Sequence, residues 1–182
     1  MRMRISGMVF AAVFGWALCV FAATGAMAQA TGEMPMEHAS HGKPSTALTI
    51  SYEGKSKSWT PQELSQMPQT AVDLYNAHTK ATEHYAGVPL IDLLKTLGVP
   101  DKPHGKDFQL YLVAEGTDGY QVVYSLGEVT PDVHDGTVLV ADTLGTAPLP
   151  ADSGAFQLVA AGEKRPARWV HNLTSIRVLS AK

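Results

Sequence analysis

Residues 162–178, near the C-terminus, hold the side chains best suited to chemistry. This segment reads GEKRPARWVHNLTSIRV and brings three cations close together: Lys164, Arg165 and Arg168. Pro166 has a fixed φ and no donor N–H, so it suits a turn or the first position of a short helix. Guanidinium groups present a planar fork of donors that matches phosphate, sulfate or carboxylate. The spacing therefore predicts that four residues form one anion-accepting, cofactor-binding wall: Lys164, Arg165, Arg168 and Trp169. The alternative is a solvated basic turn.

Sequence patterns typical of hydrolases are not found in the chain. Ser125 and Ser153 have no nucleophile-elbow context, and no HExxH pattern occurs. His84 and His171 each lie near an aromatic residue. Each of them either faces a pocket or is a hydrogen-bonded structural residue. We therefore assign no catalytic residue and no metal ligand in the domain, and we expect Glu128 and Glu163 to face solvent.

The first 28 residues have the pattern of a secretory signal peptide. Arg2 and Arg4 precede an apolar run over 8–23, and residues 26–28 (AMA) supply small residues for cleavage. We expect a mature chain that starts at Gln29 and is periplasmic or secreted. Cleavage would remove Cys19, the one cysteine, and leave no thiol for a disulfide, a metal or catalysis.

Residues 29–45 are small and polar, which predicts a flexible leader. The leader contains four potential ligands of copper: Met34, Met36, His38 and His41. Thioether and imidazole groups together suit the reduced ion, and a mobile segment can wrap it. A periplasmic copper-binding protein is therefore one alternative function, and a leader that carries these residues by chance is the other interpretation.

Residues 46–182 have the length of one domain. The formal net charge is −3, and loss of Arg2 and Arg4 makes it more negative. No basic face is long enough to follow a phosphate backbone, so we expect no nucleic-acid partner. No second apolar stretch reaches membrane-spanning length, so we expect no stable membrane insertion after processing.

Alternation and turn residues predict a strand-rich domain. The expected strands are 48–52, 70–75, 81–85, 108–113, 120–126, 137–141, 156–160 and 175–178. A short helix should follow Thr60, which precedes Pro61 and Glu63 as in a capping box, and a second should run to Gly98. Because strands and helices do not alternate regularly, we expect an α+β domain with mixed, largely antiparallel sheets and a few short helices.

Three segments, in order, resemble consecutive blocks of the sulfite-oxidase-type molybdopterin-binding domain. They read YAGVPLIDLLKTLGV, VAEGTDGYQVVYSLGEV and VLVADTLGTAPLPADSGAFQLVAAGEKRPARWVHNLTSIRVL. The resemblance covers about residues 46–179 and is greatest to the small secreted members of that fold. It implies a compact α+β unit and, for the enzymes, a molybdopterin cofactor, while a redox partner protein stays unknown.

The chain departs from that family at the metal ligand. The enzymes hold molybdenum through a cysteine on the loop after the strand that matches 70–75, where this chain reads Tyr75-Asn76-Ala77. Neither a phenol nor an amide replaces a soft thiolate. The resemblance therefore implies the fold without a complete molybdenum site.

The family's cofactor contacts are also partly altered. A histidine-glycine pair followed by an arginine is replaced by Ser153-Gly154 followed by Gln157. Arg168, before Trp169, does match the lysine or arginine of the pattern. We therefore expect an exported ligand-binding or accessory module for a small anionic ligand or a pterin. A molybdopterin-dependent oxidoreductase is the first alternative, the copper-binding protein is the second, and the sequence leaves open whether the protein is an enzyme.

Overall fold

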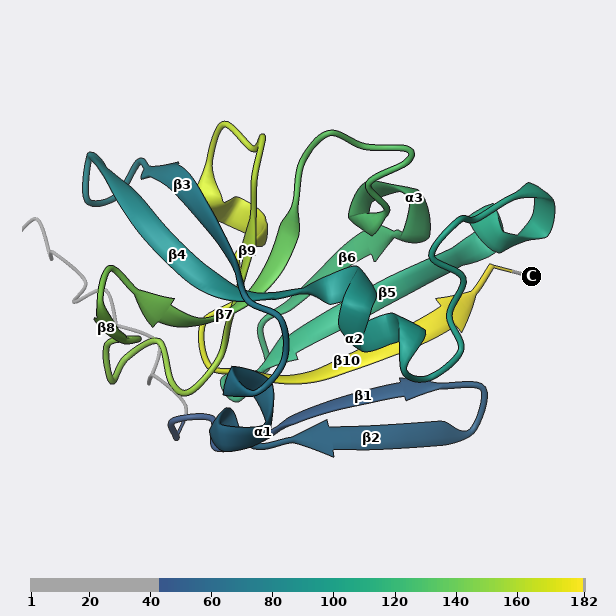
Figure 1. The fold of residues 1–182 in the computed structure, drawn as a ribbon, viewed down its shortest axis with the longest axis horizontal. Helices are drawn as coiled ribbons and strands as arrows, with labels where there is room; N and C mark the ends of the chain where they lie inside the picture. The colour runs from purple at the N-terminus through teal and green to yellow at the C-terminus, as the bar shows by residue number, and fades with distance from the viewer. Residues whose placement is uncertain (1–42, 182) are drawn as a thin grey trace, which may run out of the picture. The chain divides into compact units, whose positions relative to one another are not determined.

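The computed structural model describes residues 43–181 (Figure 1). The expected signal peptide, Cys19 and the methionines and histidines of the leader lie outside the described residues. None of the helices in the described part of the chain is long and apolar enough to span a membrane.

The first sheet joins the beginning and the end of the domain. Its strand order is β2-β1-β10-β5-β6. The bounds are β1 Leu48–Tyr52, β2 Lys55–Trp59, β5 Leu110–Gly116, β6 Gln121–Ser125 and β10 Leu173–Ser180. The β1 and β10 strands are parallel, and the other neighbours are antiparallel. The central β10 therefore anchors the C-terminal segment between two parts of the chain that are distant in sequence.

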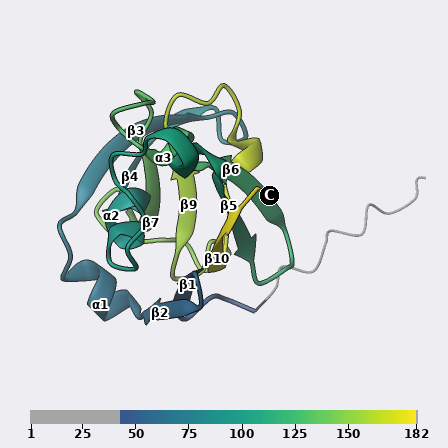
Figure 2. The ribbon, with the colours of Figure 1, turned by 90° about the vertical axis from the view of Figure 1, so that its right-hand side faces the viewer.

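The second sheet is antiparallel throughout and has the strand order β3-β4-β7-β8, with β9 also paired to β7. The bounds are β3 Thr70–Asn76, β4 Ala81–Pro89, β7 Val138–Leu144, β8 Ala147–Pro148 and β9 Gln157–Ala160. Gly87 allows a close approach of β4 to β7, because a Cβ there would overlap the Val140 carbonyl. Figure 2 shows α2 (Leu90–Lys95) beside β4 and β7.

Short helices connect the strands. Thr60 caps α1 (Pro61–Ser65) through the expected capping box with Glu63. The α2 helix buries its leucines, and Gly98 follows it with a φ of 92°. The remaining short helices are α3 Leu126–Val129, η1 Gly105–Gln109 and η2 Pro166–Arg168, where Pro166 takes the expected first position.

Both sheets contribute to one hydrophobic core. Its fully buried members include Ile50, Leu112 and Ile176 from the first sheet, and Val140 and Leu158 from the second. Mostly antiparallel mixed sheets with few short helices confirm the predicted α+β class.

Several predicted boundaries differ from the structure. The strand expected from residue 108 starts at Leu110, because Asp107 accepts the His104 N–H and helps close η1. The β4 strand continues to Pro89 instead of ending at residue 85. The β2 strand, KSKSW, was not predicted, since as an exposed edge strand it lacks apolar alternation.

Candidate functional site

The four residues predicted as an anion-accepting wall lie on and around η2, but they do not share one cavity. Lys164 and Arg165 are exposed, and Arg168 is half-buried. Trp169 is buried, and its Nε1 donates to the Ala160 carbonyl at 3.3 Å. Its ring packs edge-on against the Tyr85 ring, with 5.6 Å between the ring centres. Trp169 is thus largely a core residue whose edge reaches a pocket.

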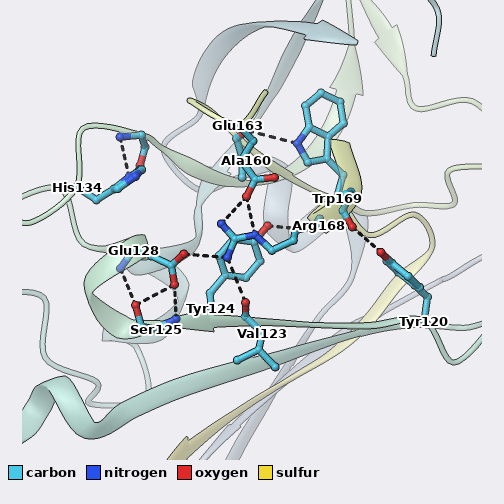
Figure 3. A network of polar contacts seen from close by, with 12 residues as sticks. Tyr120, Val123, Tyr124, Ser125, Glu128, His134, Ala160, Glu163, Arg168 and Trp169 are labelled. Carbon is cyan, nitrogen blue, oxygen red and sulfur yellow. Dashed lines mark hydrogen bonds and ion pairs between the residues drawn. The ribbon is translucent and has the colours of Figure 1, made fainter. Parts of the chain in front are cut away.

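Arg168 is held between two carboxylates (Figure 3). Its Nε and Nη2 donate to Glu163 Oε1 at 2.8 and 2.6 Å, and its Nη1 donates to Glu128 Oε1 at 2.8 Å. The guanidinium carbon lies 4.4 Å from the centre of the Tyr124 ring. Two negative charges therefore face one positive charge, which disfavours binding of a further anion at Arg168.

The backbone of the same loop is tied to β6. The Tyr124 hydroxyl donates to the Arg168 carbonyl at 2.8 Å, and the Tyr120 hydroxyl donates to the Ala167 carbonyl. Arg168 Nη1 also reaches the Val123 carbonyl at 3.3 Å. We call this set of contacts around Arg168 the clamp, because it fixes the loop before Trp169 to the edge strand.

Glu128 belongs both to the clamp and to the start of α3. Its Oε2 accepts the Ser125 backbone N–H at 2.8 Å and the Ser125 hydroxyl at 2.9 Å. Burial raises the pKa of Glu128, but the hydrogen bonds from Ser125 and Arg168 outweigh it and hold the pKa below its usual range. The side chains of Glu128 and Glu163 are 36% and 16% exposed. The expectation that both face solvent was therefore wrong, most clearly for Glu163.

A polar cavity of about 260 Å³ lies beside this loop. It is lined by three segments: the turn after β3, the turn between β5 and β6, and the stretch that follows Arg165. The lining residues are Asn76, His78, Asp118, Tyr120, Pro166, Ala167, Trp169 and His171. We call it the imidazole pocket. Sequence reasoning marked His171 as a possible pocket residue, but it assigned no role to His78.

The His171 ring is placed by polar contacts on both nitrogens. Its Nδ1 lies 3.1 Å from Ser153 Oγ, and its Nε2 lies 3.4 Å from Gln157 Nε2. Ser153 and Gln157 are 5% and 1% exposed, so both belong to the interior. The buried Ser153 hydroxyl therefore helps to hold the His171 ring in place.

Glu83 holds Asn76, one of the residues that line the imidazole pocket. Its carboxylate accepts from the Tyr85 hydroxyl at 2.6 Å, Asn76 Nδ2 at 2.9 Å and Thr79 Oγ1 at 2.7 Å. Burial raises the pKa of Glu83, but these three donors outweigh it and lower the pKa overall. Burial, and then Glu83, raise the pKa of Tyr85. The Asn76 amide at the wall is thereby fixed in orientation.

These residues do not fit a molybdenum-pterin group as the resemblance implies it. The end of β3 and the turn after it offer an amide and an imidazole to the pocket, where the resemblance implies a thiolate for the enzymes. Among the described residues that line the pocket there is no lysine or arginine for a phosphate. Within residues 43–181, moreover, no group of three or more His, Cys, Asp or Glu side chains is placed to hold a metal ion.

Comparison with known proteins supports the fold. Neither a protein-family model nor a curated protein matches the sequence. A solved structure of the sulfane dehydrogenase SoxCD from Paracoccus pantotrophus is similar, with 22% identity and a TM-score of 0.56. The match covers 74% of this chain and 38% of that one, so the chain spans well under half the length of its structural neighbour. At this identity the likeness shows a shared fold, in agreement with the sulfite-oxidase-type α+β fold expected from the sequence.

Proposed function

We propose that this protein is a ligand-binding or accessory module of the sulfite-oxidase-type fold that works without a cysteine-ligated molybdenum. The observation that carries the proposal is the composition of the imidazole pocket. Asn76 ends β3, His78 lies in the turn after it, and His171 lines the same cavity from the C-terminal segment. The one cysteine of the chain is Cys19, which precedes the described residues.

The lining of the pocket indicates a class of ligand. The His78 imidazole, the Asn76 amide and the Tyr120 phenol offer polar atoms next to the edge of the Trp169 indole, and Asp118 contributes a carboxylate. Such a set suits a small planar heterocycle with several polar atoms, of which the pterin ring is an example. A simple anion is less well matched, because Arg168 is already bound by Glu128 and Glu163.

We also infer that the protein is exported. Arg2, Arg4 and the cleavage pattern at residues 26–28 support removal of the first 28 residues. Intact-mass measurement of protein from its own host should give a chain that starts at Gln29. A full-length product in the cytoplasm would overturn the periplasmic or secreted location.

Metal analysis and ligand titration together test the binding role. Protein purified from its own host without chelators should contain no stoichiometric molybdenum. Titration with a pterin, followed by ¹⁵N NMR, should shift the resonances of Asn76, His78 and His171. His78→Ala should weaken this binding. The matched control is His84→Ala, because His84 is exposed and pairs with Asp73 at 2.7 Å away from the pocket lining.

Two outcomes would overturn the proposal. Stoichiometric molybdenum would favour the molybdopterin-dependent oxidoreductase, which then needs a redox partner protein. Equal effects of His78→Ala and His84→Ala, or resonance shifts confined to Lys164 and Arg165, would place binding outside the imidazole pocket.

A further inference from the structure

An apolar groove lies where η1 meets α3, apart from the imidazole pocket. It has a volume of about 290 Å³ and is lined by Phe108, Ser125, Gly127, Glu128, Val133 and His134. Phe108 and Val133 are 49% and 52% exposed, which is unusual for large apolar side chains close together. Half of each of these side chains is thus left for another surface to cover.

Glycine keeps the floor of this groove open. A methyl group at Gly127 would lie 3.5 Å from Val133 Cγ1 and 3.7 Å from the Phe108 ring, which are ordinary van der Waals distances. The missing side chain therefore leaves space between the two apolar walls. Because Gly127 lies within α3 and has no positive φ, the backbone itself does not require glycine there.

The apolar surface continues from the groove over the outward face of the first sheet. Ser125 pairs with Tyr111, and Tyr111 pairs with Leu179, so these side chains form one row across β6, β5 and β10. In the next row Val123 lies opposite Val113. Val123 and Leu179 are 53% and 39% exposed. Exposed apolar side chains thus extend beyond the groove on the side of the sheet that faces away from the core.

Acidic residues lie next in sequence to the residues that line the groove, and we call them its acidic rim. Asp107 precedes Phe108, Asp132 precedes Val133, and Asp135 follows two residues later. Asp132 and Asp135 are exposed, and neither takes part in an ion pair among the described residues. Asp132 also lines a neighbouring cavity with Lys95 and Lys102, but Lys95 is already paired with Asp92 and Asp101. Lys106 supplies a further positive charge next to Asp107, and Glu128 is already paired with Arg168. The surroundings therefore favour cations on whatever binds.

We propose that this groove docks a partner protein through a segment in which an aromatic or aliphatic side chain is flanked by lysine or arginine. The apolar side chain fills the space over Gly127, between Phe108 and Val133. The flanking cations meet Asp132 and Asp135, which gives electrostatic complementarity. A second copy of the chain is the weaker candidate, because groove-to-groove packing brings two acidic rims together.

A random dodecapeptide library displayed on phage tests the chemistry of the groove. Selection on the purified protein should enrich peptides in which an aromatic or aliphatic residue lies between basic residues. The enriched consensus is then synthesised, and its dissociation constant is measured by fluorescence anisotropy. Gly127→Ala adds a methyl group to the floor at distances that the fold accommodates, and alanine favours the helix.

Changes in the dissociation constant distinguish the apolar contact over Gly127 from the charge contacts with Asp132 and Asp135. Gly127→Ala should raise the dissociation constant by about fivefold, as expected for loss of a well-packed contact. The double variant Asp132→Lys/Asp135→Lys should raise it by about tenfold at low salt, and less at high salt because screening weakens exposed charges. Tyr75→Ala is the control, since Tyr75 is 60% exposed but lies on β3 of the other sheet.

Four results would overturn the docking proposal: no enrichment, enrichment of acidic peptides, unchanged affinity in both groove variants, or equal loss in Tyr75→Ala. Sedimentation analysis provides one further test. A dimer of the unaltered protein that Gly127→Ala dissociates would assign the groove to a second copy, contrary to the proposal. None of these measurements depends on the imidazole pocket, so their failure leaves the proposed ligand-binding function unaffected.

Discussion

Replacement of Arg168 by alanine should destabilise the fold, because Arg168 is the centre of the clamp. The change removes ion pairs with Glu163 and Glu128 at 2.6 and 2.8 Å and the contact with the Tyr124 ring. It also leaves the Glu163 carboxylate, 16% exposed, without its guanidinium. The loop from Gly162 to Trp169 then loses its main side-chain attachment to β6 and α3.

The size of the expected loss in the free energy of unfolding depends on how exposed Arg168 and its partners are. Hydrogen bonds to charged groups contribute about 1.5–3 kcal/mol, whereas exposed ion pairs contribute about 0–1 kcal/mol. The Arg168 side chain is 40% exposed, so the loss of stability should exceed that of an exposed ion pair and stay below the upper value for a charged hydrogen bond. We expect Arg168→Ala to lower the free energy of unfolding by about 2 kcal/mol and Tm by roughly 6 °C. Arg168→Lys keeps the charge but loses the fork, and should cost about half as much.

Thermal unfolding followed by circular dichroism measures these changes. Arg165→Ala is the matched control, since Arg165 lies in the same loop, is exposed and forms no ion pair among the described residues. Its Tm should stay close to that of the unaltered protein. Equal Tm values for Arg168→Ala and Arg165→Ala would refute the clamp. Loss of phosphate binding in Arg168→Ala, with Tm unchanged, would instead establish the anion-accepting wall predicted from the sequence.

Three further predictions concern stability. Because the pKa of Glu128 is lowered in the folded state, its contribution is complete above the ordinary glutamate value of about 4.3 and is lost as pH falls through the folded-state value. Urea unfolding should therefore give lower stability at pH 3 than at pH 6, and Glu128→Gln should reduce this difference. Thr60→Ala removes the cap of α1 and should cost about 1 kcal/mol in urea unfolding, whereas an unchanged midpoint would contradict the capping box. Gly87→Ala should cost more than about 3 kcal/mol, since its Cβ would overlap the Val140 backbone, and a Tm near that of the unaltered protein would show that β4 can move.

The regular parts of the fold could be predicted because they depend on local signals. Alternation gave β1 with its observed bounds, and the Thr60 capping box and Gly98 marked helix ends. The edge strand β2 escaped prediction because its alternate residues are lysine and serine. Phe108 was placed in a strand because it begins an apolar-rich run before a hairpin turn, but it lies in η1, where the His104 N–H donates to Asp107.

The candidate site was less predictable, because its side chains meet through tertiary contacts. Glu128 lies 40 residues from Arg168 along the chain, and no spacing rule connects them. Glu163 is nearer, and the turn at Pro166 brings it back to the guanidinium. A carboxylate placed just before such a turn is the one signal in the sequence that pointed to an internal ion pair.

The motif match at Arg168 shows how one residue type can serve two purposes on one fold. By resemblance, a lysine or arginine before the tryptophan indicates a cofactor contact. In this chain the guanidinium instead spans Glu163 and Glu128, and the backbone carbonyl of the same residue accepts from Tyr124. Both interactions fix the segment before Trp169 and His171 against β6 and α3. Trp169 and His171 in turn line the imidazole pocket. Arg168 thus supports a wall of the imidazole pocket without lining it. In the proposed binding role, His78 and Asn76 would contact the ligand in place of the basic residue.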